Sequence, residues 1–179
     1  HMSERYSLRR AELVDAAALA ALKRQTFRET FVDGPIAVGY SEESLSLFEA
    51  EAYSEQTVTA QLRDPRRAQW VVEAPSGMLV AYAHAGPCKL PHNEAQPQDG
   101  ELYQIYVADS WQGVGIGHLL LDTALEWLAQ TMPGPVWLGV FSGNAGAQEV
   151  YAARGFVKVG EYQFKVGAHR DHELIFRKG

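Results

Sequence analysis

The sequence has a single cysteine, Cys88, among its 179 residues. A lone cysteine excludes an internal disulfide and provides no cysteine-based spacing for a metal site. Low cysteine use is typical of proteins from a reducing compartment. We therefore expect a cytoplasmic location.

Basic residues are too few for a nucleic-acid binder. Lys and Arg number 16 against 22 for Asp and Glu, which gives a formal net charge of −6. Proteins that bind nucleic acid need a basic surface to face the phosphates. Long hydrophobic runs are missing as well, because the most apolar stretches, at 16–22 and 78–83, are far shorter than the ~20 residues of a membrane span. We expect no nucleic-acid partner and no membrane partner.

The apolar residues that are present suffice for one globular core. Hydrophobic residues make up 46% of the chain and charged residues 21%, which excludes a disordered or collagen-like chain. The length fits one domain, since domains usually contain ~100–200 residues. His1 precedes Met2 and is interpreted as a residue left by an expression vector, so the expected domain is 3–179.

The hydrophobic pattern predicts alternating helices and strands. Helices are expected from Asp15 to 33 and at 42–51, 54–63, 117–130 and 145–154. Strands are expected at 6–10, 69–74, 78–85, 101–107, 136–141, 156–166 and 170–177. The proline-rich segment 86–100 reads as a loop, and a loop of that length is often functional.

Three glycines alternate between the strand at 101–107 and the next helix: Gly113, Gly115 and Gly117. Glycine lets the backbone approach a ligand, and the free N–H groups of a helix start attract anions. A pyrophosphate is the natural occupant. A P-loop would need Lys after the last glycine, where this chain has His118. A dinucleotide fold would need Gly-x-Gly-x-x-Gly early in the chain. A tight turn without a ligand is the remaining alternative.

A second cluster follows the buried strand at 136–141. Asn144 is placed to cap a helix, and Ala147 leaves room for close approach. Tyr151 lies seven residues after Asn144, about two helical turns, and can therefore face the same cleft. A purely structural role as a core aromatic residue is the alternative for Tyr151.

Together, Gln112-x-x-Gly115-x-Gly117 and Asn144-x-x-Ala147-x-x-x-Tyr151-x-x-x-Gly155-Phe156 resemble the two signature motifs of the GNAT superfamily of acyl-CoA-dependent N-acetyltransferases. The order of the expected elements is similar across essentially the whole chain. The resemblance implies an α/β (α+β) fold with a central mixed, mostly antiparallel sheet of about seven strands. Strands four and five would splay apart, and about four helices would flank the sheet.

The resemblance also implies an acetyl-CoA site and no metal. Backbone groups of Ile105 and Val107 would hold the pantetheine arm, the amides of 112–117 would bind the pyrophosphate, and Tyr151 would protonate the departing thiolate. The full set of expected cofactor-binding residues is Ile105, Tyr106, Val107, Gln112, Gly113, Val114, Gly115, Ile116, Gly117, His118, Asn144, Ala147 and Tyr151.

An amine acceptor is mostly protonated at neutral pH and must lose a proton before it attacks a thioester. Glu101 begins the strand that leads into the glycine turn and is the expected base, acting directly or through water. Strand alternation places Tyr103 and Ile105 on the face of Glu101 and Gln104 on the other. The expected acceptor-binding residues are Phe27, Phe31, Tyr40 and Tyr103.

The sequence therefore predicts an N-acetyltransferase that acts on the primary amine of a small molecule by direct attack. Some segments resemble bacterial polyamine N-acetyltransferases. A catalytically silent acyl-CoA sensor, acetylation of a peptide amine and a nucleotide-binding oxidoreductase are the alternatives. His169 and His172 lack a third ligand, so no metal site is expected. The hydrophobic final strand at 170–177 is a candidate for pairing across a homodimer.

Overall fold

The structure, a computed structural model, describes residues 6–179. Within these residues, seven strands form one mixed sheet in the order β1-β2-β3-β4-β5-β7-β6. β4 and β5 are parallel, and the other neighbouring strands are antiparallel. The predicted mixed, mostly antiparallel sheet is confirmed. His1 and the expected domain start at Ser3 lie outside the described residues.

The elements follow the predicted order. The strands are β1 (Ser7–Arg10), β2 (Ala68–Glu73), β3 (Leu79–Pro87), β4 (Gly100–Val107), β5 (Val136–Phe141), β6 (Val157–Val166) and β7 (His169–Lys178). The helices are α1 (Ala16–Phe31), α2 (Glu42–Ala52), α3 (Glu55–Arg63), α4 (Ile116–Thr131) and α5 (Ala145–Ala153), with short 3₁₀ turns at Leu13–Asp15 and Asp109–Trp111.

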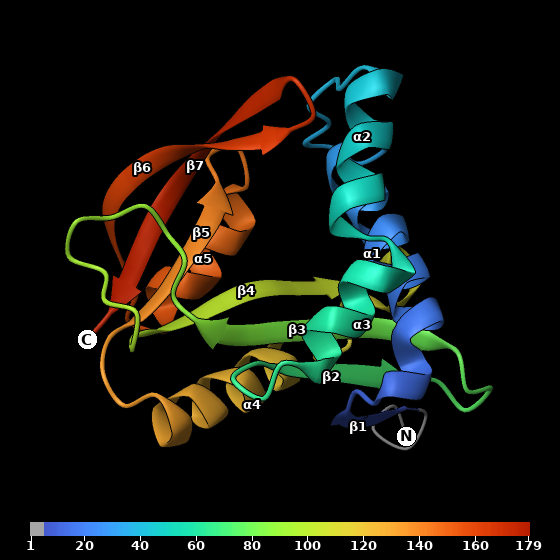
Figure 1. Ribbon diagram of the computed structural model, residues 1–179, viewed down its shortest axis with the longest axis horizontal. Coiled ribbons are helices and arrows are strands. Elements are labelled where there is room, and N and C mark those ends of the chain that lie inside the picture. The colour runs from blue at the N-terminus through green and yellow to red at the C-terminus, as the bar shows by residue number, and fades with distance from the viewer. Residues whose placement is uncertain (1–5) are drawn as a thin grey trace.

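Helices cover both faces of the sheet (Figure 1). On one face, Leu19 and Leu22 of α1 and Val58 of α3 pack on Val71 and Tyr82. On the other face, α4 and α5 pack on alternate residues of β3 and β4; the buried members of that cluster include Ala81, Ala83, Leu102, Leu120, Leu121 and Leu128. Side chains of β3 alternate between the two clusters, so the sheet separates two cores.

Polar side chains at the predicted helix starts satisfy backbone N–H groups. The Ser54 hydroxyl accepts from Thr57 N at 3.1 Å, and the Asn144 side chain accepts from Ala147 N at 3.1 Å. Asp15 differs from the prediction that it caps the first helix: its carboxylate accepts the N–H of Glu12 at 2.7 Å and pairs with Arg9 at 2.8 Å. It therefore stabilises the 3₁₀ turn that precedes α1.

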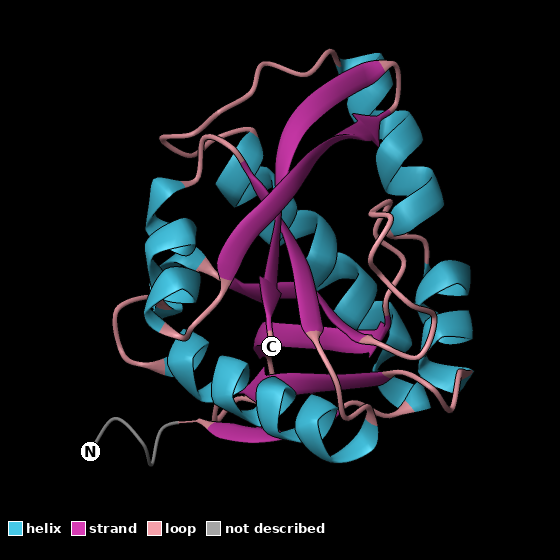
Figure 2. Ribbon diagram, turned by 90° about the vertical axis from the view of Figure 1, so that its left-hand side faces the viewer, coloured by secondary structure: helices cyan, strands magenta, loops and turns pink. Residues whose placement is uncertain are grey.

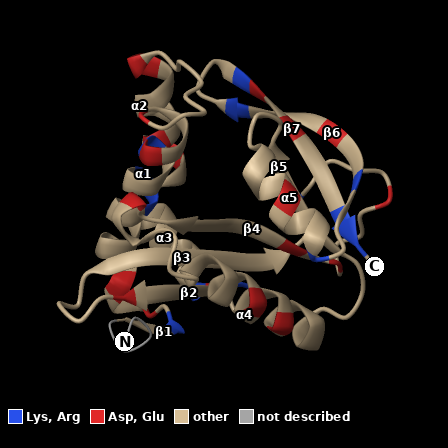
Figure 3. Cartoon of the chain, turned by 180° about the vertical axis from the view of Figure 1, so that it is seen from behind, with Lys and Arg blue, Asp and Glu red and all other residues tan. Residues whose placement is uncertain are grey.

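The last strand is an interior strand, with β5 on one side and β6 on the other (Figure 2). Its backbone is already paired, so the prediction that it pairs across a dimer is wrong. Basic and acidic residues are interspersed along β6 and β7, and α4 carries acidic residues (Figure 3). Among residues 6–179, every helix is too short or too polar to span a bilayer.

Candidate active site between β4 and β5

The sheet opens between its two parallel strands. β4 and β5 pair at Gly100–Val136 and Glu101–Trp137 and then diverge. A cavity of about 470 Å³ lies on the α1 side of the opening, and one of about 200 Å³ lies toward α4 and α5. Ile105, Ala147 and Tyr151 line both cavities, so the two spaces meet at these residues.

The glycine turn lies at the mouth of the smaller cavity. Gly113 and Gly115 have φ angles of +82° and +90°, which L side chains rarely adopt, and a Cβ atom on either would meet no atom within 4 Å. Gln112 fixes the turn to the end of β4, because its side chain donates to the carbonyl oxygen of Val107 at 3.0 Å. The turn is open on its outer side, and the first N–H groups of α4 have no acceptor within the helix. This arrangement suits an anionic ligand.

The other expected cofactor-binding residues lie on both sides of the sheet. Val107, Gly117 and His118 line the smaller cavity. Tyr106 lies on the opposite face, where its ring contacts Phe31 with the centroids 6.4 Å apart. The side chain of Tyr106 therefore lines the larger cavity and not the smaller one.

Tyr151 projects from α5 to the junction of the two cavities. Its ring meets Phe156 edge-on, with the centroids 6.0 Å apart. Burial raises the pKa of Tyr151 to about 12, so its hydroxyl keeps its proton at neutral pH. A protonated hydroxyl at this junction can donate to a group that enters from either side.

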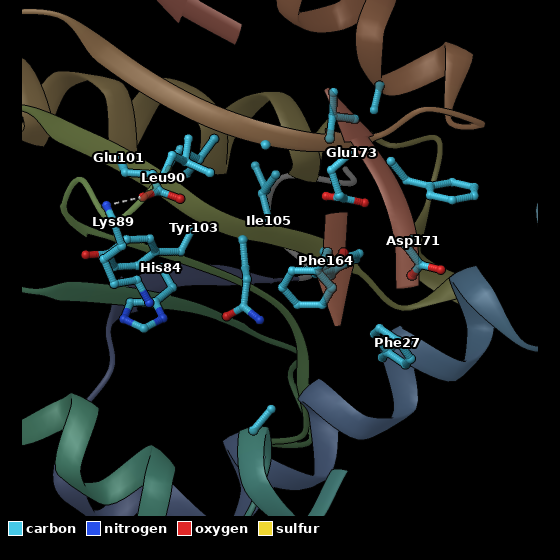
Figure 4. A pocket seen from close by; sticks show the side chains of 18 of the residues that line it. Phe27, His84, Lys89, Leu90, Glu101, Tyr103, Ile105, Phe164, Asp171 and Glu173 are labelled. Carbon is cyan, nitrogen blue, oxygen red and sulfur yellow. Dashed lines mark hydrogen bonds between the residues drawn. The ribbon is translucent and has the colours of Figure 1, made fainter. Parts of the chain in front are cut away.

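Glu101 lies in the wall of the larger cavity and is 7% exposed. Its carboxylate accepts the backbone N–H of Lys89 at 2.8 Å (Figure 4). Burial raises its pKa to about 7, and this bond and the charges of Lys89 and Arg67 oppose the increase. A carboxyl group with this pKa can both accept and release a proton near neutral pH.

Tyr103 sits at a bulge in β4. Gln104 pairs with His84 and Leu102 with Ala85, so Tyr103 has no opposite residue on β3. The extra residue changes the alternation: Gln104 lies on the cavity side, where its side chain reaches the Tyr53 hydroxyl at 3.4 Å. The prediction that Gln104 faces away from Glu101 and Tyr103 is wrong, since a bulge breaks the two-residue period.

Aromatic side chains form the wall on the α1 side. Phe27 and Phe31 line the larger cavity, and Tyr103 lines it from the sheet. Tyr40 stands behind Phe27, with ring centroids 5.8 Å apart, and its hydroxyl donates to the carboxylate of Asp171. Tyr40 itself does not line the cavity, in contrast to the prediction that it binds the acceptor, because Phe27 and Asp171 lie between it and the cavity.

Glu173 is a candidate that the sequence analysis missed. It lies on β7 opposite Phe141 and lines the larger cavity, across from Ile105 in Figure 4. Within residues 6–179, its carboxylate forms no ion pair or hydrogen bond. Burial and the nearby Asp171 raise its pKa to about 8. The signal in the sequence that could have identified it is its position directly before the apolar residues 174–176 of the same strand.

The remaining sequence candidates lie at different places. His169 pairs with Asp171 at 3.1 Å, and His172 pairs with Glu161. The thiol of Cys88 has a pKa raised by burial to about 11, which makes it a weak nucleophile. Of the three arginines that lie shortly before β2, Arg63, Arg66 and Arg67, it is Arg67 that lines the larger cavity.

A sequence profile described as acetyltransferase (GNAT) family matches residues 24–156. The chain belongs to this family. An uncharacterised N-acetyltransferase of Mycobacterium tuberculosis is 30% identical to this GNAT chain over 169 residues, which cover 91% of this chain and 96% of the relative. One from Lactobacillus delbrueckii subsp. lactis is 25% identical over 164 residues, covering 92% and 91%.

Solved structures share the fold. The PaiA N-acetyltransferase from Thermoplasma acidophilum, solved in complex with coenzyme A, aligns with a TM-score of 0.73 at 17% identity, covering 97% of this chain and 98% of the other. The predicted GNAT fold is confirmed, with the splayed strands in the expected place. The prediction of an acetyl-CoA-dependent N-acetyltransferase is confirmed as well.

Proposed function

We propose that this GNAT enzyme acetylates the primary amine of a small molecule inside the larger cavity. The observation that carries the proposal is that the two cavities meet at Ile105, Ala147 and Tyr151. One ligand can therefore enter along the glycine turn and the other along the aromatic wall, with their reacting ends at Tyr151. Direct transfer needs both reactants held in one complex, with the reacting atoms close together.

The residues around the smaller cavity fit the expected acetyl-CoA. The first N–H groups of α4 have no acceptor within the helix, the N–H of Gln112 donates to Asp109 O at 3.3 Å, and the Cβ positions of Gly113 and Gly115 are open. Acetyl-CoA supplies the acetyl group as a thioester. Backbone groups of Ile105 and Val107 would hold its pantetheine arm beside Ala147, and Asn144 caps the helix that carries Tyr151.

Two carboxylates can take the proton of the acceptor amine. Glu173 lies opposite Ile105, near the reacting end; with a pKa of about 8 it accepts a proton through its ionised form, which increases as the pH approaches 8. Glu101 is four residues before Ile105 on β4, roughly 13 Å along a strand, so it would act through water. We assign direct proton transfer to Glu173 and a relay to Glu101. Tyr151 keeps its proton and would donate it to the departing sulfur.

The test follows free thiol released from acetyl-CoA in the presence of polyamines, amino acids, aminoglycosides and short peptides. We expect release with a class of small amines. Release with peptides alone would move the function to a protein or peptide amine. Tight acetyl-CoA binding without release on any amine would favour a silent acyl-CoA sensor.

A further inference from the structure

Three cations line the larger cavity where β3, α1 and α3 meet: Lys23, Arg67 and Lys89. We refer to these residues as the basic end. The ring of Tyr103 lies between two of them, with the Arg67 guanidinium 4.9 Å and the Lys89 ammonium 4.5 Å from its centroid. The cations are close enough that Arg67 and Lys89 both lower the pKa of Lys23.

Lys23 lacks a counter-ion. It is 1% exposed, and its ammonium lies 3.4 Å from the Gln61 side-chain oxygen and 5.1 Å from the ring centroid of Tyr82. Within residues 6–179, no carboxylate pairs with it. Burial is the main cause that lowers its pKa to about 7. A buried lysine is rarely retained without a paired anion, because desolvation disfavours its charge.

The other two cations each lie near a carboxylate: Arg67 pairs with Asp64, and Lys89 lies beside Glu101. Arg67 approaches His84 Nε2 at 3.3 Å and Asp64 at 3.4 Å. A guanidinium can only donate, so the imidazole nitrogen accepts; burial keeps His84 neutral by lowering its pKa. Glu101 accepts the backbone N–H of Lys89, and its carboxylate forms no ion pair with the Lys89 ammonium. These contacts use Nη1 and Nε of Arg67 and fix the position of its guanidinium, so Nη2 is the nitrogen left to donate to an anion.

The opposite side of the cavity is acidic. Asp171 and Glu173 lie there beside Phe164, whereas Lys89 and His84 lie across the cavity in Figure 4. A ligand in this cavity thus meets Asp171 and Glu173 near the reacting end. At the other end it meets three basic side chains and one carboxyl group, Glu101. A diamine would place its second ammonium group against Lys23, and Coulomb repulsion opposes that arrangement.

We propose that the acceptor carries an anionic group, a carboxylate or a phosphate, that binds between Lys23, Arg67 and Lys89 while its amine lies at Glu173. This inference rests on the proposed acetylation of a small amine and names its substrate class. The acceptor is then a zwitterion: its amine lies beside Glu173 and Asp171, and its anion would favour the charged form of Lys23 on binding.

Matched pairs of acceptors test the proposal. L-amino acids are compared with their α-amides, 4-aminobutyrate with butane-1,4-diamine, and O-phosphoethanolamine with ethanolamine, each with acetyl-CoA at saturation. The carboxylate and phosphate arms identify which anion is preferred. We expect the anionic member of at least one pair to have a kcat/KM higher by about tenfold or more. Equal or better use of the neutral or cationic members throughout would overturn the proposal.

Variants connect that preference to the basic end. Lys23→Met keeps the shape of a long unbranched side chain and should raise KM for the anionic acceptor by about tenfold, with kcat changed far less. Arg66→Gln is the matched control, since Arg66 is exposed and pairs with Asp64. An equal loss for anionic and neutral acceptors in Lys23→Met would show that Lys23 only supports the fold.

A binding measurement separates this proposal from the proposed function. The ¹³Cε resonance of Lys23, assigned through Lys23→Met, is followed while glutarate or inorganic phosphate is added to the acetyl-CoA-free enzyme. A saturable shift in wild type and in Arg66→Gln supports the anion site even if no amine is acetylated. Turnover of neutral amines together with an unmoved Lys23 resonance would refute the anion site and leave the acetyltransferase function intact.

Discussion

Replacing Glu173 with Gln should stabilise the protein progressively as the pH rises. The folded-state pKa of Glu173 is about 8, raised from 4.5 mainly by burial. A carboxyl group whose folded pKa is raised contributes stability that is fully present below the unfolded pKa and lost as the pH rises through the folded pKa. Between pH 4.5 and 8, wild type therefore loses stability that Glu173→Gln retains.

The size of the effect follows from that difference in pKa. Each unit corresponds to about 1.4 kcal/mol, so the full shift sets an upper bound of about 5 kcal/mol. Water that reaches the carboxylate through the open cavity reduces this value, and we expect the advantage of Glu173→Gln to grow by about 2 kcal/mol between pH 5 and pH 9. In a chain of this length, that corresponds to about 4–8 °C in Tm.

Thermal unfolding of wild type and Glu173→Gln at pH 5, 7 and 9, followed by circular dichroism, measures the effect. Glu149→Gln removes an exposed carboxylate on α5 and is the control. The difference in Tm between Glu149→Gln and wild type should stay constant from pH 5 to pH 9. A Glu173→Gln difference that is equally flat would refute the reasoning, because it would mean that the carboxylate is hydrated and already ionised at neutral pH.

Three other changes test the remaining parts of the site. Tyr151→Phe should lower kcat by about tenfold to hundredfold with unchanged acetyl-CoA affinity, because it removes a proton donor; an unchanged kcat in steady-state assays would exclude Tyr151 as the acid. Glu101→Gln should shift the pH–rate profile toward higher pH, since a group with a pKa of about 7 is lost; a profile of the same shape would place the relay elsewhere. Gly115→Ala should weaken acetyl-CoA binding, measured by calorimetry, since a side chain at φ +90° costs about 1–2 kcal/mol and the turn must rearrange. Gly39→Ala, at φ +82° outside the site, should lose similar stability but bind acetyl-CoA normally.

Local signals in the sequence predicted the helices, the strands and the glycine turn, whereas the mixed sheet with splayed strands was predicted from the resemblance to the GNAT superfamily. Gly113 and Gly115 stand where the backbone needs a positive φ, and Asn144 caps the helix that follows β5. These features depend on residues that are neighbours in the chain, so a motif can encode them. The order of strands and helices carried the rest of the fold, because parallel β4 and β5 require a helical crossover such as α4.

The acceptor cavity was harder to predict because distant segments build it. The bulge at Tyr103 depends on the register of β3 against β4, which strand alternation alone does not reveal. Glu173 reaches the cavity because β7, the last strand in the chain, lies next to β5 in the sheet. The local sequence around Glu173 does not reveal that neighbour. Lys23 could have been noticed from the sequence, because it lies on the same apolar face of α1 as Leu19 and Phe27. A charged residue at such a buried position is a candidate for a binding role.

The β6–β7 turn links these distant parts into one enclosure. Gly167 in this turn has φ +60°, and a Cβ atom there would lie 2.5 Å from Ser44 Cα, so the turn packs directly on α2. Ala168 N also donates to the Ser44 hydroxyl at 3.3 Å. This contact joins the start of β7, the strand that carries Glu173, to α2, and α2 is bound to α1 by the Arg28–Glu49 ion pair at 2.7 Å. Because the helices and the splayed half of the sheet meet at the turn, the larger cavity has walls on both sides. The proposed small-molecule acceptor fits such a cavity of about 470 Å³, since pockets of roughly 300–1,000 Å³ are typical of small-ligand sites.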